Sequence, residues 1–366
     1  MLHRVLALIL VLASIAGLAG CGSTTSHYVF ATLPAANEVA SYREDPNSGV
    51  LTEIAGSPFP AGDGATSAVI HPSGKYLYTA NPGVGENDIS LFSIASDGVL
   101  TEITPRTSVA PGASDPLTMV MDPGGKYLYV ANVLSNNISV FSISSSSGAL
   151  SQVTGSPFPI GASPLNMAIS PTGNFLYVTS GVGVSSQSSF GSILGFSVNA
   201  GSLTRISGGQ TGSDGQDPTG VAIDPKGAYL YVTNKGSSSI AIFAIDATTG
   251  GLSELSGSPL NDVDQGPVAV IVDPSGDFLY VANQGSSNVA TYSLSAGFPT
   301  VISDSPFASE TDPTFLAIDP GKKYLFVGNQ QPGTPGIQAF GNSAGSLNAI
   351  FTYATGNTPS SLVVLQ

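Results

Sequence analysis

The sequence predicts an all-β fold, a closed seven-bladed β-propeller built from four-stranded antiparallel blades. Three observations lead to this prediction: one motif repeats along the chain, each repeat contains four strand-like segments, and the composition favours turns. The 366 residues include 44 Gly and 26 Pro. Such a density of Gly and Pro leaves no room for long helices, so we expect many short strands joined by turns.

The repeated motif has the form Asp-Pro-x-Gly-x-Tyr-Leu-Tyr-Val-x-Asn, and its copies recur every 46–54 residues. Six copies begin at His71, Asp122, Ser170, Asp224, Asp273 and Asp319. A seventh copy at residues 28–32 lacks the leading turn. Repeats of this length are typical of stacked units such as propeller blades.

Each repeat contains four segments with the character of strands, which we call strands A to D in chain order. Strand A is a short run before the Asp-Pro turn, such as residues 218–223, and strand B is the Tyr-Leu-Tyr-Val segment. Strand C is exemplified by residues 137–141 and strand D by residues 49–54. Polar and apolar residues alternate in strands B and C, as expected for strands with two unlike faces. Seven such sheets make a propeller.

The two ends of the repeat region complement each other. No segment before Tyr28 resembles strand A, whereas residues 359–365 resemble strand A and have no strand B after them. We therefore expect the C-terminal strand to become the innermost strand of blade one, in a propeller domain of residues 28–366. Closing the ring in this way satisfies two sheet edges that would otherwise stay unpaired.

The first 20 residues are predicted to be a signal peptide, because Arg4 is followed by an apolar run over residues 5–18. The next residues, Leu-Ala-Gly-Cys21, resemble a bacterial lipobox, and Cys21 is the only Cys of the chain. We expect lipid on Cys21, a tether of residues 21–27, attachment to the membrane and a place in the bacterial cell envelope. Gly22 in place of Asp favours the outer membrane in a Gram-negative cell. The alternative is an ordinary signal peptide with an incidental Cys.

The charge balance limits the partners. Asp and Glu number 24 against 10 Lys and Arg, which gives a formal net charge of -14. Such an excess of acid cannot neutralise a phosphate backbone, so nucleic-acid binding is not expected. A hydrophobic share of 42% with only 9% charged residues argues against disorder. A monomeric protein is expected.

The predicted topology divides the loops between two faces of the ring. A–B and C–D turns lie on one face, the bottom, whereas B–C loops and D–A connections lie on the other, the top. Acidic side chains predominate on the top, where the channel opens. The candidate ligand-binding residues at this mouth are Asp63, Asp115, Asp217, Asp264, Asp312 and Arg106. The Asp residues of the bottom turns, and His71 in the same slot, are interpreted as turn caps.

Three of these candidates, Asp115, Asp217 and Asp312, directly precede the Pro that opens strand A. Converging carboxylates suit a hard cation such as Ca²⁺, which takes six to eight oxygen ligands. The alternative is that they belong to solvated Asp-Pro turns spaced too widely to share one ion. A Ca²⁺ site is therefore one hypothesis for these residues, and no cofactor is required by the sequence.

Tyr231-Val-Thr-Asn and the recurrent Gly-Ser-Pro-Phe at residues 56–59 and 155–158 resemble the YVTN repeats of the seven-bladed lactonase family. This family includes 6-phosphogluconolactonase-like enzymes, and the resemblance covers residues 28–366. It implies a lactone hydrolase that uses a His, an Arg and an acid at the channel mouth, with the His directly after the Pro that opens strand A. That slot is instead filled by Leu117, Leu165, Thr219, Val268, Thr314 and Ser360. No catalytic residue is assigned.

Two classes of function remain open. The first is an envelope-anchored binding or scaffold module whose acidic top face meets a polysaccharide, a small molecule or a protein. The second is a lactone hydrolase with a rearranged site at the channel mouth. Blade four departs most from the repeat, and its polar segments 180–192 and 207–217 are expected to form long loops at the binding surface.

Overall fold

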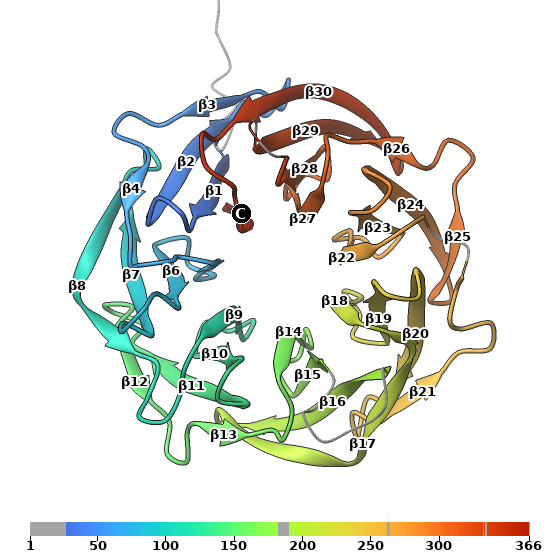
Figure 1. The fold of residues 1–366 in the computed structure, drawn as a ribbon, viewed down its shortest axis with the longest axis horizontal. Coiled ribbons are helices and arrows are strands. Elements are labelled where there is room, and N and C mark those ends of the chain that lie inside the picture. The colour runs from blue at the N-terminus through green and yellow to red at the C-terminus, as the bar shows by residue number, and fades with distance from the viewer. Residues whose placement is uncertain (1–26, 182–189, 262–263, 332, 334, 366) are drawn as a thin grey trace, which may run out of the picture.

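The computed structural model describes residues 27–181, 190–261, 264–331, 333 and 335–365. Throughout this part of the chain the structure is all-β, and seven sheets surround a central axis (Figure 1). The predicted seven-bladed propeller is therefore confirmed. No helix in the described residues is long and apolar enough to cross a membrane.

Blade three shows the plan that the other blades follow. The innermost strand β9 (Pro116–Met121) pairs with β10 (Tyr127–Asn132), which pairs with β11 (Asn137–Ile143). The outer strand is divided into β12 (Leu150–Gln152) and β13 (Phe158–Pro159), and both parts pair with β11. All pairs are antiparallel, so strands A to D of the sequence prediction correspond to these strands from the axis outward.

The other six blades repeat this order from the axis outward. Blade one contains β31 (Ser361–Leu365), β1 (His27–Leu33), β2 (Glu38–Glu44), β3 (Leu51–Glu53) and β4 (Phe59–Pro60). Blade two contains β5 (Ser67–Ile70), β6 (Tyr76–Asn81), β7 (Asp88–Ile94) and β8 (Leu100–Ser108). Blade four contains β14 (Pro164–Ile169), β15 (Phe175–Ser180), β16 (Phe190–Asn199) and β17 (Ser202–Gln216). Blade five contains β18 (Pro218–Ile223), β19 (Tyr229–Asn234), β20 (Ser239–Ile245) and β21 (Leu252–Glu254). Blade six contains β22 (Pro267–Val272), β23 (Phe278–Asn283), β24 (Asn288–Ser295), β25 (Phe298–Val301) and β26 (Phe307–Ala308). Blade seven contains β27 (Pro313–Ile318), β28 (Tyr324–Asn329), β29 (Gly336–Ser343) and β30 (Ser346–Ala354).

Blade one is completed from the end of the chain, as expected. Strand β31 pairs antiparallel with β1, with Leu365 opposite Tyr28 and Ser361 opposite Thr32. In Figure 1 the C-terminal strand lies beside β1, inside the blade formed by the first strands. Strand β1 begins at His27, one residue before the predicted start of the propeller. The last strand of the chain therefore closes the ring.

Blade four differs from the prediction in its outer part. The segment 207–217 was expected to be a long loop, but β17 continues through 15 residues to Gln216 and pairs with β16, which has 10 residues. The pairing reaches from Asn199 and Ser202 at one end to Phe190 and Gln216 at the other. Residues 182–189 of the other predicted loop lie outside the described residues.

The hydrophobic core lies between neighbouring blades. In one cluster, Tyr129 and Val140 of blade three pack against Leu176 and Leu194 of blade four, and all four are buried. Clusters of this kind join each blade to the next around the ring. Each blade therefore buries both of its faces, so the two unlike faces expected from alternation in strand B are not found: β10, for example, is buried from Leu128 to Asn132.

Buried tyrosines of strand B link adjacent blades at the bottom. Tyr177 donates a hydrogen bond of 2.7 Å to the carbonyl of Gly250 in the next blade. In the same way, Tyr78 donates to the carbonyl of Gly148 in the next blade, and Tyr231 donates to that of Gly297. Tyr129 occupies the same slot in blade three, but its buried hydroxyl has no hydrogen-bond partner among the described residues. The chain thus contains matched positions with and without this bond.

Replacement of Tyr177 by Phe should lower the free energy of unfolding by about 1 kcal/mol, because it removes a buried hydrogen bond and leaves the acceptor unpaired. Tyr129→Phe is the matched control and should leave the free energy of unfolding unchanged or slightly higher, since it removes an unsatisfied hydroxyl. Chemical denaturation of both variants would measure the difference. Equal losses in the two variants would contradict the assigned bonding.

Candidate functional site

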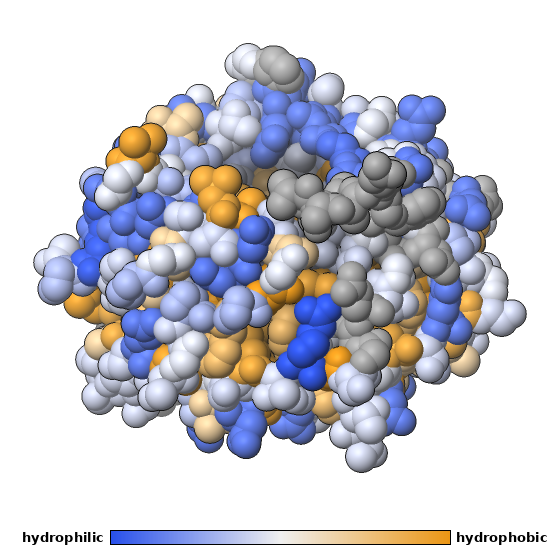
Figure 2. Space-filling model, turned by 60° about the horizontal axis from the view of Figure 1, so that its bottom comes forward, coloured by the Kyte–Doolittle hydropathy of each residue, from blue (hydrophilic) through white to orange (hydrophobic). Residues whose placement is uncertain are grey.

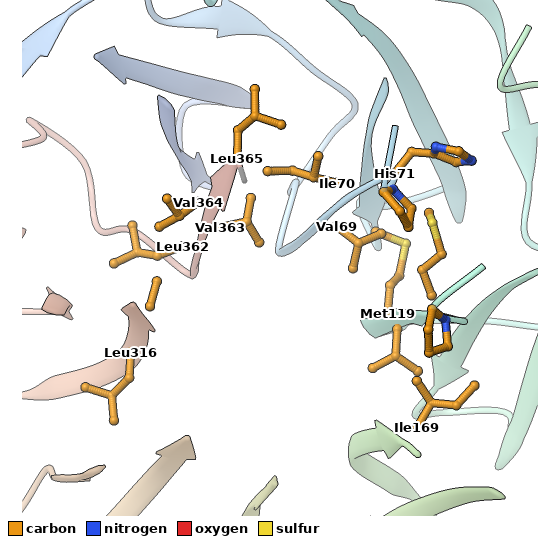
Figure 3. A pocket seen from close by; sticks show the side chains of 15 residues that line it. Val69, Ile70, His71, Met119, Ile169, Leu316, Leu362, Val363, Val364 and Leu365 are labelled. Atoms are coloured by element: carbon orange, nitrogen blue, oxygen red, sulfur yellow. The ribbon is translucent and has the colours of Figure 1, made fainter. Parts of the chain in front are cut away.

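The innermost strands surround a central channel that holds two cavities. The lower cavity, of about 670 Å³, is lined mainly by residues of the inner strands, and its side chains are apolar apart from His71. Met119, Ile169 and Leu316 are among the residues that line it (Figure 3). On the face seen in Figure 2, hydrophobic side chains are visible in the hollow at the centre of the ring, inside a mostly hydrophilic rim.

His71 lies at the edge of the lower cavity, and both nitrogens of its imidazole lie within hydrogen-bond distance of backbone groups in turns. Its Nδ1 accepts a hydrogen bond of 3.0 Å from the Ser73 amide, and its Nε2 lies 3.0 Å from the carbonyl of Gly125. Asp224, in the same slot of blade five, accepts bonds of 2.6 Å from two turn amides. His71 therefore caps its turn, as the sequence suggested.

The upper cavity, of about 480 Å³, lies at the start of the inner strands. Its lining includes apolar residues such as Val268 and Phe315. Its polar side chains are Asn166, Thr219, Lys235, Gln284, Thr314 and Ser361. None of the described residues that line it is a His, an Asp or a Glu. The arrangement is thus a small pocket with neutral hydrogen-bonding groups and one ammonium group.

The slot directly after the opening Pro, where the family resemblance implies a His, holds residues that join neighbouring blades. Thr219 Oγ1 donates to the carbonyl of Pro267 in the next blade at 3.1 Å. Ser360 Oγ donates to the carbonyl of Thr66 at 2.7 Å, and Thr66 Oγ1 lies 3.3 Å from the carbonyl of Leu117. Inner strands of adjacent blades belong to different sheets, so these hydroxyls supply hydrogen bonds between them.

The three Asp residues that precede an opening Pro share an unusual backbone conformation. Their φ angles are 62° at Asp115, 58° at Asp217 and 64° at Asp312. Gly64 and Gly266 occupy the equivalent positions of blades two and six, with φ of 72° and 65°. Gly, Asn and Asp are the residues that adopt this left-handed region most readily. The backbone alone therefore accounts for the recurrence of Asp in this slot.

The carboxylates of these three Asp residues do not form a compact group of metal ligands. In the part of the chain that the structure describes, one set of three His, Cys, Asp or Glu ligand atoms lies within 4.8 Å of one another, and it lies elsewhere, at the bottom of the ring. A Ca²⁺ ion shared by the three Asp residues would need backbone and water oxygens as well. Calcium binding there stays a prediction.

The remaining candidates lie away from the channel wall. Arg106 is on β8, the outermost strand of blade two, where its guanidinium donates to Glu102 at 2.7 Å and to Glu86 at 3.1 Å. Asp264 accepts a hydrogen bond of 2.8 Å from the side chain of Asn288. The Asp63 amide donates to Glu86 at 3.2 Å. The structure thus brings Asp63 and Arg106 to the same acidic cluster, and it leaves Asp264 apart.

The sequence reasoning missed the polar groups that the upper cavity brings together. The slot expected for a His lies one residue after the opening Pro, whereas Asn166 and Ser361 lie two residues after it. Lys235 and Gln284 directly follow the Asn that ends strand B in blades five and six. A comparison of every slot of the repeat, in place of the one slot expected for a His, would have detected these polar residues.

Comparisons with known proteins agree with the geometry of the ring. The chain matches the family described as Lactonase, 7-bladed beta-propeller, over residues 23–162, 161–263 and 257–364. A 6-phosphogluconolactonase of Formosa agariphila is 42% identical over 82 residues, which span 22% of this chain and only 22% of that protein.

Solved structures cover nearly the whole chain. A Bacteroides fragilis protein with a provisional 6-phosphogluconolactonase assignment has a TM-score of 0.77 at 18% identity, over 94% of this chain and 99% of that one. The periplasmic gluconolactonase PpgL of Pseudomonas aeruginosa has a TM-score of 0.75 at 18% identity, over 93% and 99% of the two chains. Identities this low establish a shared fold alone.

The backbone explanation of the Asp slot can be tested at Asp115. Asp115→Gly should leave the free energy of unfolding unchanged or higher, because Gly adopts a positive φ without strain, whereas Asp115→Ala should lower it by about 1 kcal/mol. Thermal unfolding with and without CaCl₂ would measure both effects. A Ca²⁺-dependent rise in melting temperature that is lost in Asp115→Gly would show instead that the carboxylate is kept for cation binding.

Proposed function

The chain belongs to the seven-bladed β-propeller lactonase family, and we propose that it serves as an envelope-anchored binding module that takes a small polyhydroxylated ligand in the upper channel. The observation that carries this proposal is the upper cavity, where neutral polar side chains and Lys235 surround a space of about 480 Å³. Pockets of this size, mostly apolar and with a few convergent polar groups, are typical of small-molecule sites.

The lining suits a sugar or a related polyol. Amide and ammonium groups of Asn166, Gln284 and Lys235 provide hydrogen bonds for hydroxyl groups, and Val268 and Phe315 offer apolar contact for the C–H face of a ring. Around the mouth, the acidic rim that includes Asp217 and Asp312 disfavours anions. A neutral ligand therefore fits better than a phosphorylated one.

A lactone hydrolase is the second candidate, favoured by the family and by the partial identity to a 6-phosphogluconolactonase. Hydrolysis of a lactone needs a base that activates water. In the described lining of the upper cavity no imidazole or carboxylate is present, and Lys235 is its one titratable side chain. His71, at the lower cavity, is engaged by its turn. The lining therefore supports binding more directly than catalysis.

The proposed anchor agrees with the direction of the first strand. Cys21 lies outside the described residues, but β1 begins at His27 on the bottom of the ring, six positions later. Six residues span at most about 20 Å. Lipid on Cys21 would thus hold the bottom close to the membrane and leave the upper cavity facing away from it. Lysines on the bottom turns would favour anionic headgroups: Lys75, Lys126, Lys226, Lys322 and Lys323.

Ligand binding can be tested by calorimetry with a panel of neutral mono- and oligosaccharides. Asn166→Leu and Gln284→Leu should each weaken binding by about tenfold, since each loses a hydrogen bond to the ligand. Gln152→Leu, an amide-to-leucine change on the outer strand β12, is the matched control and should bind as the parent does.

The same protein should be incubated with a panel of lactones and examined by mass spectrometry. No ring opening above the uncatalysed rate is expected. Ring opening that disappears in Lys235→Met would overturn the binding proposal in favour of the hydrolase, and a lack of saccharide binding by the parent would also count against it.

Anchoring can be tested separately by cell fractionation. Cys21→Ser should move the protein from the membrane fraction to the soluble fraction, because the thiol that would carry the lipid is removed while the propeller stays intact. Gly22→Ala is a suitable control and should remain in the membrane fraction. Membrane attachment that persists in Cys21→Ser would contradict the lipoprotein prediction.

A further inference from the structure

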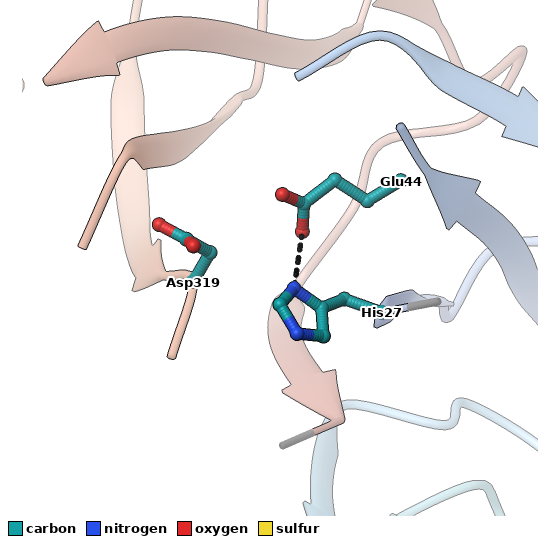
Figure 4. Close-up of side chains that lie close together, drawn as sticks. All are labelled: His27, Glu44 and Asp319. Carbon is teal, nitrogen blue, oxygen red and sulfur yellow. Dashed lines mark ion pairs between the residues drawn. The ribbon is translucent and has the colours of Figure 1, made fainter. Parts of the chain in front are cut away.

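A cluster of three ligand-type side chains, two of them buried and one partly exposed, lies at the bottom of the seam between blades one and seven (Figure 4). His27 is the first residue of β1, Glu44 is the last residue of β2, and Asp319 lies in the turn that follows β27. One ligand atom from each lies within 4.8 Å of the others, and His27 Nδ1 is 3.7 Å from Glu44 Oε2.

Glu44 is the residue that the fold leaves unexplained. It is only 1% exposed, yet neither of its carboxylate oxygens accepts a hydrogen bond from the described residues. The buried Nδ1 of His27 has no hydrogen-bond partner there either. Burial raises the pKa of the Glu44 carboxyl to about 8, and the nearby Asp319 adds to the shift while Lys323 opposes it. A buried carboxylate that accepts no hydrogen bond is costly.

The repeat of the blade shows that packing does not require an acid at this position. Glu44 is the last residue of the third strand of its blade. The equivalent residues of blades two to six are aliphatic: Ile94, Ile143, Val198, Ile245 and Leu294. In those blades the slot is filled by an apolar side chain. Blade one alone among the seven combines a carboxylate there with a His at the start of its second strand.

We propose that His27, Glu44 and Asp319 bind one zinc-class divalent metal ion that joins the first and last blades of the ring. An imidazole nitrogen with two carboxylate oxygens is a donor set that suits zinc and related transition metals. Ligand atoms of a tetrahedral zinc site lie about 3.4 Å apart, so a small inward rotation of the three side chains would complete it. The side chain of His27 is 18% exposed, which gives water access to the fourth position.

Asp319 is already oriented for this role. Its Oδ1 accepts a hydrogen bond of 2.6 Å from the Tyr324 amide, and its Oδ2 accepts one of 2.9 Å from the Gly321 amide. Each carboxylate oxygen can accept a further interaction. Lys323, whose charge lowers the pKa of Glu44, donates from its Nζ to the carbonyl of Pro46 at 3.4 Å. A bound dication would neutralise the charge that the buried carboxylates bring.

The consequence would be a metal clasp across the point where the ring closes. His27 and Glu44 belong to the first strands of the chain, and Asp319 belongs to the last complete repeat. A metal that links residues so distant in sequence stabilises the folded state, because no such site exists in the unfolded chain. The clasp is independent of the ligand pocket at the top.

The test uses the full chain with Cys21→Ser, purified without a polyhistidine tag and treated with EDTA, so that no thiol or tag binds the probe. Calorimetric titration with ZnCl₂ should give one ion per chain, and the melting temperature should rise with zinc. His27→Ala and Glu44→Gln should each lower the affinity at least tenfold. His71→Asp should bind zinc as the parent does, since it removes a His outside the cluster and restores the turn residue of other blades.

A further variant distinguishes loss of the metal site from loss of folding. Glu44→Leu introduces the kind of side chain that blades two to six carry, so it should fold and yet lose the zinc-dependent rise in melting temperature. Cobalt titration should produce visible absorption bands of a low-coordinate site in the parent and none in Glu44→Leu. Failure of the parent to bind one zinc ion, or binding that survives both His27→Ala and Glu44→Leu, would overturn the proposal and leave an ion pair between His27 and Glu44.

Discussion

The structure depends on the burial of both faces of every blade against its neighbours. The hydrophobic clusters lie between blades and not within them, so no blade can be stable with one face exposed. The ring must therefore close, and β31 provides the pairing that completes blade one. The interblade tyrosines and the hydroxyls of the inner strands add directed bonds to the same interfaces.

This constraint also determines where a ligand site can arise. The side chains of strands B and C are buried between blades, and the Asp side chains of the bottom turns cap the turn amides. The starts of the inner strands and the first residues after strand B face the upper channel, where a change of side chain costs little packing. Asn166, Lys235 and Gln284 lie at such positions. Binding groups can therefore vary there while the ring is preserved.

The fold could be predicted because each repeat carries its own strand and turn pattern, and because the missing strand A at one end matches the surplus one at the other. Less of the site could be predicted. The recurrence of Asp115 and its equivalents suggested a shared metal site. Their positive φ angles explain the recurrence by backbone conformation instead, and a φ angle cannot be read from the sequence. The loop expected at 207–217 was wrong, because β17 continues through these polar and Gly-rich residues by pairing with β16, the strand directly before it in the chain. The buried position of Glu44 likewise depends on blade seven.

The closure by β31 has a consequence for the order in which the protein can fold. Tyr28 finds its partner Leu365 only when almost the whole chain has been made. Until then blade one is a three-stranded sheet with an open edge, and an open edge is a site for unwanted pairing with other chains. Tyr28 and Leu365 are separated by almost the whole chain, and contacts of such large sequence separation slow folding. Blade one is therefore begun by β1 and completed only by β31, so its inner edge stays open until the other six blades have been made.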